Sequence, residues 1–210
     1  MPELATGLTN LLILVSAVCC LLSLPDRREY RLWRRLFCLT ALVAACGAAV
    51  HVLVLPEAAE LILWALFDLS VCPLLLLLAL AAREDVGPPL TPRLQGLLLA
   101  AALGCALNMI RLLLRQGFRA QFPSAAALGL AAAAVYVVSQ WQGRTRPGGR
   151  SRCGLLAVTL LLLSGLTWLL GDFTVTLGPV QLTQAAWLHI GLAAALPLFR
   201  LSAGRGGPET

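Results

Sequence analysis

Seven polar side chains lie within or at the ends of apolar segments of this chain, and several of them have types that do chemistry. They are Asn10, His51, Asp68, Asn108, Arg111, Asp172 and His189. Imidazole and carboxylate groups bind metal ions and transfer protons. Because a polar group in hydrocarbon is costly without a partner or water, residues of this kind are candidates for a functional site by default.

The elements that carry these residues are predicted to be transmembrane helices. The 210-residue chain is 59% hydrophobic and 12% charged, with a mean hydropathy of +0.85. Soluble domains carry about a quarter charged residues, so the composition predicts an integral, multi-pass membrane protein. We expect an all-α fold in which residues 1–203 form a seven-transmembrane-helix bundle and residues 204–210 a disordered tail. The predicted spans are approximately 4–24, 36–55, 59–82, 94–114, 123–141, 153–171 and 180–200.

The basic residues set the predicted orientation of these spans. All 16 are Arg, and most lie in the first, third and fifth loops or after the last span. The positive-inside rule therefore predicts that the N-terminus is outside and the C-terminus cytoplasmic. Arg in short loops is not a nucleic-acid-binding face, so no nucleic acid is expected as a partner. The absence of Lys excludes a retinal protein, which needs a Lys amine for its Schiff base.

This orientation places the seven polar residues in the non-cytoplasmic half, whereas the cytoplasmic half has little beyond Tyr136, Ser139 and Gln140. Residues three or four apart share a helix face, and small residues on a face mark close helix contact in membranes. The small neighbours are Ala44, Gly47 and Ala48 for His51, Ala185, Ala186 and Ala193 for His189, and Ala101 and Gly104 for Asn108 and Arg111. These patterns predict an inward-facing polar pocket.

The layout resembles the seven-helix membrane hydrolase superfamily, which includes the alkaline ceramidases and the progestin/adiponectin receptors. The matching pieces are Ala48-Ala-Val-His51, Phe67-Asp-Leu-Ser70, Ala185-Ala-Trp-Leu-His-Ile190 and the preceding Trp168-Leu-Leu-Gly-Asp-Phe173. The resemblance implies a metal-dependent hydrolase of a lipid amide or ester. In it, His51 and His189 would bind zinc, and Asp68 would be a further ligand or the catalytic base.

The chain departs from the family pattern at two places. The family has a second His one turn away in the last helix, but here Ala185 and Ala193 stand at those positions, and Gly47 replaces a family Ser. With two His in the whole chain, a three-His zinc site cannot form. A site made of His51, His189 and Asp68 stays chemically open, because carboxylate can replace imidazole as a zinc ligand.

We therefore expect a protein that contacts membrane lipid and has a polar pocket in the non-cytoplasmic half of its bundle. We interpret it as a diverged relative of the membrane lipid hydrolases, either active or inactive. The alternatives are a non-enzymatic, receptor-like protein that binds a lipid-like or small-molecule ligand, and a carrier of protons or small solutes. Simpler roles also stay open for single residues. Asn10 or Asn108 can bridge two helices, Arg111 can extend to the lipid headgroups, and Asp172 can cap a span.

Overall fold

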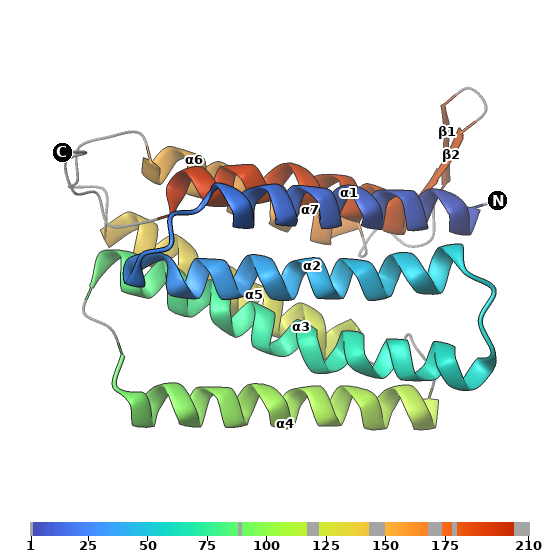
Figure 1. The fold of residues 1–210 in the computed structure, drawn as a ribbon, viewed down its shortest axis with the longest axis horizontal. Coiled ribbons are helices and arrows are strands. Elements are labelled where there is room, and N and C mark those ends of the chain that lie inside the picture. Colours follow the sequence, from blue (N-terminus) through green and yellow to red (C-terminus); the bar gives the residue numbers. More distant parts are fainter. Residues whose placement is uncertain are drawn as a thin grey trace.

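The computed structural model describes residues 2–87, 90–116, 122–142, 150–167, 174–177 and 180–203. These residues form seven α-helices, a short 3-10 helix and one β-hairpin, so the expected all-α class is confirmed apart from the hairpin (Figure 1). The elements are α1 (Pro2–Ser23), η1 (Arg28–Tyr30), α2 (Arg31–Val52), α3 (Glu57–Val86), α4 (Pro92–Gln116), α5 (Phe122–Gln142), α6 (Arg150–Leu166), β1 (Thr174–Leu177), β2 (Val180–Thr183) and α7 (Gln184–Ser202).

Six of the helices are long and apolar enough to cross a membrane, namely α1, α2, α3, α4, α5 and α7. The remaining helix, α6, is apolar but has 17 residues, fewer than a typical span of about 20. The lengths agree with a multi-pass membrane protein. The crossing of α6 and the outside location of the N-terminus stay predictions.

The start of the last predicted span is wrong. Residues 180–183 belong to strand β2, which pairs antiparallel with β1, so that Thr174 lies opposite Thr183. Polar and apolar residues alternate in both strands, Thr-Val-Thr-Leu and Val-Gln-Leu-Thr, and this pattern favours extended backbone. Helix α7 begins at Gln184, where the Thr183 hydroxyl accepts a hydrogen bond from the Ala186 N–H at 3.3 Å and caps the helix. The end of the sixth predicted span, residues 168–171, lies outside the described residues, as does the tail at 204–210.

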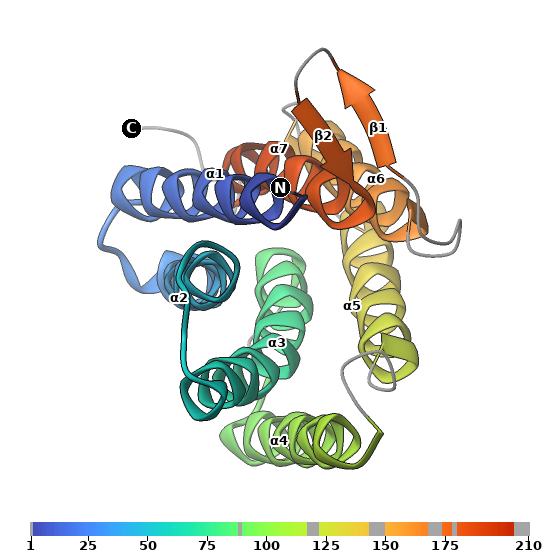
Figure 2. The same cartoon turned by 90° about the vertical axis from the view of Figure 1, so that its right-hand side faces the viewer.

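Six helices form a closed ring, in the order α1, α2, α3, α5, α6 and α7, and α7 packs back on α1 (Figure 2). Helix α4 lies outside this ring, where it packs mainly on α3. Residues Ala102, Ala106 and Met109 of α4 and Cys72 of α3 make a small buried cluster between the two helices. One side of α4 is thus left without a helix neighbour.

The main core lies nearer the end where α1 and α7 terminate. Trp33, Phe37, Tyr136 and Phe199 are all buried there, and the rings of Tyr136 and Phe199 meet edge to face at 5.1 Å between centroids. These four aromatic residues come from α2, α5 and α7. The core therefore contains residues from helices in different parts of the ring.

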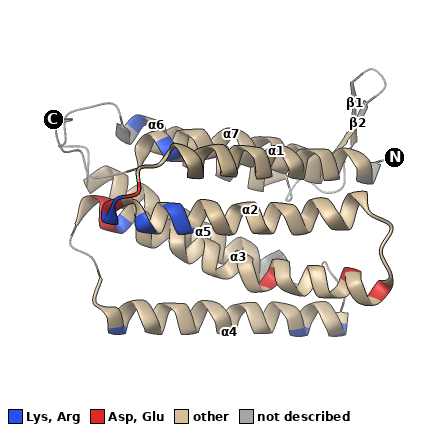
Figure 3. Ribbon diagram, in the orientation of Figure 1, with Lys and Arg blue, Asp and Glu red and all other residues tan. Residues whose placement is uncertain are grey.

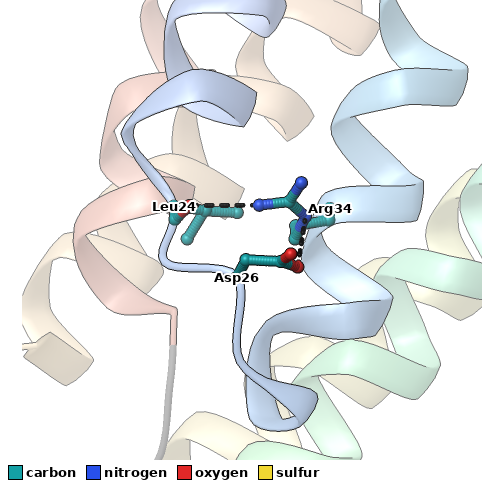
Figure 4. A network of polar contacts seen from close by, with 3 residues as sticks. All are labelled: Leu24, Asp26 and Arg34. Carbon is teal, nitrogen blue, oxygen red and sulfur yellow. Dashed lines mark hydrogen bonds and ion pairs between the residues drawn. The ribbon is translucent and has the colours of Figure 1, made fainter.

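The two ends of the bundle differ in charge (Figure 3). We call the end where α1 and α7 terminate the arginine end. There the Arg34 side chain donates to the Leu24 carbonyl at 3.3 Å and lies 3.7 Å from the Asp26 carboxylate (Figure 4). In the same region, Arg200 donates to the hydroxyl and carbonyl oxygens of Ser23 at 2.9 and 2.7 Å. The opposite end, where α1 and α7 begin and α2 terminates, is the histidine end.

Candidate functional site

The histidine end joins α1 to α7 through hydroxyl groups and an imidazole. The Thr9 hydroxyl lies 3.2 Å from Nδ1 of His189, and the Thr6 and Thr183 hydroxyls are 3.1 Å apart. The Thr9 hydroxyl also donates to the Thr6 carbonyl at 2.9 Å. Ala186, one turn before His189, is fully buried against the bundle. His189 is half-buried and contacts α1 across the α1–α7 interface.

His51 belongs to the last turn of α2 and is half-buried at the same end. Its ring meets Trp64 of α3 edge to face at 5.9 Å between centroids. The small residues Ala44, Gly47 and Ala48 on its helix face are buried, as the sequence pattern predicts. His51 thus lies where α1, α2 and α3 converge.

Two glycines let α1 and α2 approach closely beside His51. A Cβ atom on Gly7 would collide with the Val52 side chain and lie 3.3 Å from the Cβ of His51. A Cβ atom on Gly47 would lie 2.9 Å from Oδ1 of Asn10. Asn10 is buried, and its amide donates to the Thr6 carbonyl at 3.3 Å. Asn10 thus lies in the contact between α1 and α2.

Asp68 lies in the middle of α3 and has no exposed surface. Among the described residues, which include both His, no three His, Cys, Asp or Glu side chains are placed so that they could hold a metal ion. His51, His189 and Asp68 are therefore not assembled as a metal centre in this structure. Asp68 is a buried carboxylate within the bundle. The other two residues of the predicted site, His51 and His189, both lie at the histidine end.

The predicted inward orientation of Asn108 and Arg111 is wrong. Both side chains are exposed on α4, as are Ala101 and Gly104 of the same stripe. The Arg111 guanidinium donates to Oδ1 of Asn108 at 3.0 Å. The face of α4 that packs on α3 is the neighbouring one, because the buried residues of this helix are Ala102, Ala106 and Met109. Asp172, the remaining predicted pocket residue, lies outside the described residues.

The arginine end also contains buried polar contacts, which involve Tyr136 and an Asp that the predicted spans leave out. The indole N–H of Trp33 donates to the buried Asp85 carboxylate at 3.0 Å, and the Tyr136 and Ser202 hydroxyls are 2.7 Å apart. Sequence reasoning misses Asp85, because the third predicted span ends at residue 82. The helix continues to Val86, and Gly87 is the first helix-ending residue after the apolar run. That glycine is the signal that could have extended the span.

Similarity to known proteins places the chain in a family but gives it no activity. A family model described as a family of unknown function, DUF6962, matches residues 5–207. The chain belongs to DUF6962. The match extends from the first turns of α1 past the end of α7, so this DUF6962 domain includes both ends of the bundle. No curated protein and no solved structure matches the chain.

Proposed function

We propose that this DUF6962 protein is a seven-span membrane protein that binds the polar group of a lipid-like ligand at its histidine end. We further propose that it is a diverged, non-catalytic relative of the seven-helix membrane hydrolases. The observation that carries the proposal is the contact between Thr9 and His189, which draws an imidazole and a hydroxyl from opposite ends of the chain to one place. His51 supplies a second imidazole at the same end of the bundle.

The chemistry of these groups suits an amide head group. Because the Thr9 hydroxyl donates its proton to the Thr6 carbonyl, it accepts from Nδ1–H of His189, which leaves Nε2 of this imidazole as a hydrogen-bond acceptor. A lipid amide has an N–H donor that complements this acceptor. Small-residue contacts at Gly7 and Gly47 hold α1 against α2 at this end, which limits the movement of His51 and Asn10. A pre-organised site of this kind loses less entropy on binding.

A binding role is favoured over zinc hydrolysis because catalytic zinc takes three protein ligands together with a water molecule. The histidine end brings together two His, and the described residues hold no group of three suitable side chains. Thr9 also engages Nδ1 of His189, one of the two nitrogens through which a His could bind a metal. The receptor-like alternative uses the same site and differs only in whether binding is passed on as a signal.

The proposal is tested with a fluorescent ceramide, a lipid amide, added to the purified full-length protein in detergent. We expect saturable binding that weakens about tenfold in His189→Ala, which corresponds to the loss of one well-made polar contact. We expect no release of fatty acid. Tyr136→Phe is the matched control, since it removes a polar contact at the arginine end and should leave ceramide affinity unchanged.

Two results would contradict the proposal. One is ceramide binding that is absent, or equal in the wild type and in His189→Ala. The other is release of fatty acid that requires Asp68, together with about one equivalent of zinc that survives dialysis and is lost in His51→Ala. The second result would establish the active hydrolase instead.

A further inference from the structure

A groove runs along the outside of the helix ring between α4 and α5. Its volume is about 510 Å³, and it is lined by Ala101, Gly104, Cys105, Asn108, Ser124, Ala127 and Leu128. Most of this lining is small and apolar. The volume lies within the roughly 300–1,000 Å³ typical of small-molecule sites. We propose that this groove binds one acyl chain of an anionic phospholipid, whose phosphate contacts Arg111.

The arrangement of α4 explains why the groove exists. Helix α4 packs on α3 through Ala102, Ala106 and Met109, and its adjacent stripe is left exposed. A Cβ atom built on Gly104 meets nothing within 4 Å, so no side chain of the described protein fills this space. Both α4 and α5 are long and apolar enough to cross a membrane. In a bilayer, the groove therefore opens to lipid.

The charge at one end of the groove selects the type of lipid. The Arg111 guanidinium is exposed and lies against Asn108, which lines the groove, at 3.0 Å. Arg115 follows one turn later and is also exposed. Neither α4 nor α5 contains an Asp or a Glu, and the described acidic residues nearest this end, Glu57 and Glu60, belong to the first turn of α3. An anionic head group that contacts Arg111 gains about 1 kcal/mol, whereas a zwitterionic head group does not.

The size of the groove favours an acyl chain over a second copy of the protein. The lining on α4 runs from Ala101 to Asn108, about 10 Å along the helix axis at 1.5 Å per residue. Two transmembrane helices that pack on each other share a contact up to about 30 Å long, so the groove is short for a second copy. A thin, flexible hydrocarbon chain can occupy such a space along its length.

Native mass spectrometry of the purified full-length protein tests the proposal with two lipids of identical acyl chains, phosphatidylglycerol and phosphatidylcholine. We expect at least one retained phosphatidylglycerol and about fivefold weaker retention of phosphatidylcholine. Arg111→Gln should remove this fivefold preference. Arg93→Gln is the matched control, because Arg93 is an exposed Arg at the other end of α4 and its replacement should leave the preference unchanged.

A second pair of variants tests the groove itself. Gly104→Leu should fill the groove and abolish retention of both lipids. Gly96→Leu makes the same substitution on α4 at another position with open space around its Cβ, away from the groove lining, and should retain lipid as the wild type does. Equal retention of the two lipids by the wild type would overturn the proposal. Unchanged lipid retention in Gly104→Leu would also overturn the proposal. If this variant in addition loses a dimer that the wild type forms, the groove is assigned to a second copy of the protein.

Discussion

His189 and Asp85 show how single polar residues are accommodated among apolar helices. Each has a partner from a distant part of the chain, Thr9 for His189 and Trp33 for Asp85. In a membrane interior such contacts are worth about 0.6 kcal/mol on average, because the unfolded chain also finds partners. Removing one partner of a buried charged group costs more than this average. The two contacts should therefore respond differently to substitution.

Replacing Trp33 by Phe should lower the free energy of unfolding by about 1–3 kcal/mol, because the buried Asp85 carboxylate loses a donor. The Trp33 side chain is 1% exposed, and its ring packs on Phe37 with centroids 6.1 Å apart, a contact that Phe largely keeps. Unfolding in mixed SDS and mild-detergent micelles measures this change.

The control for this variant is Trp64→Phe. The indole of the half-buried Trp64 donates to Glu60 at 3.4 Å in an exposed hydrogen bond, so the loss of this bond should cost less than about 0.5 kcal/mol. Equal losses in the two variants would show that the effect comes from ring size and not from the buried hydrogen bond with Asp85.

At the scale of elements, close approach between helices depends on glycines at particular contacts. Gly7 and Gly47 face α2 and α1 respectively, and Gly154 of α6 leaves room for the Tyr136 hydroxyl, which would lie 2.5 Å from an added Cβ. Other helical glycines, such as Gly129, have open space around them. Some small residues of these helices therefore lie in close helix–helix contacts, whereas others have open space around them. Their spacing in the sequence does not distinguish the two groups.

Gly47→Ala should destabilise the protein by about 1–3 kcal/mol, since its new methyl group would press on Asn10 and force α1 away from α2. Gly129→Ala should be neutral or stabilising by up to about 1 kcal/mol, because Ala favours helix and meets no neighbour there. Thermal unfolding of both variants in detergent provides the comparison. A stabilising Gly47→Ala would contradict the close packing of α1 and α2.

For the whole molecule, the main question is how many helices cross the membrane. The ring of six helices places α1 and α7 side by side, and α7 ends opposite to where α1 begins (Figure 1). Helix α6 has 17 residues, about 26 Å at 1.5 Å per residue, against a hydrocarbon thickness of about 30 Å. A slightly short span is accommodated by local thinning of the bilayer at modest cost.

We expect tags at the N-terminus and the C-terminus to lie on opposite sides of the membrane, with the C-terminal tag cytoplasmic, because Arg gathers at that end. Protease protection of the two tags in sealed, oriented membrane vesicles measures this. Protection of both tags, or of neither, would mean an even number of crossings and would remove α6 from the set of spans.

The amino-acid sequence alone predicts the number, type and approximate length of the helices, because long apolar runs in lipid have little alternative to a helix. It also indicates the inward faces of His51 and His189. Tertiary packing determines which residues meet. It pairs Thr9 with His189 and Trp33 with Asp85, and it turns Asn108 and Arg111 outward. The helical period of a sequence shows which residues share a helix face. It does not show whether that face packs on protein or on lipid, because in a membrane both neighbours are apolar.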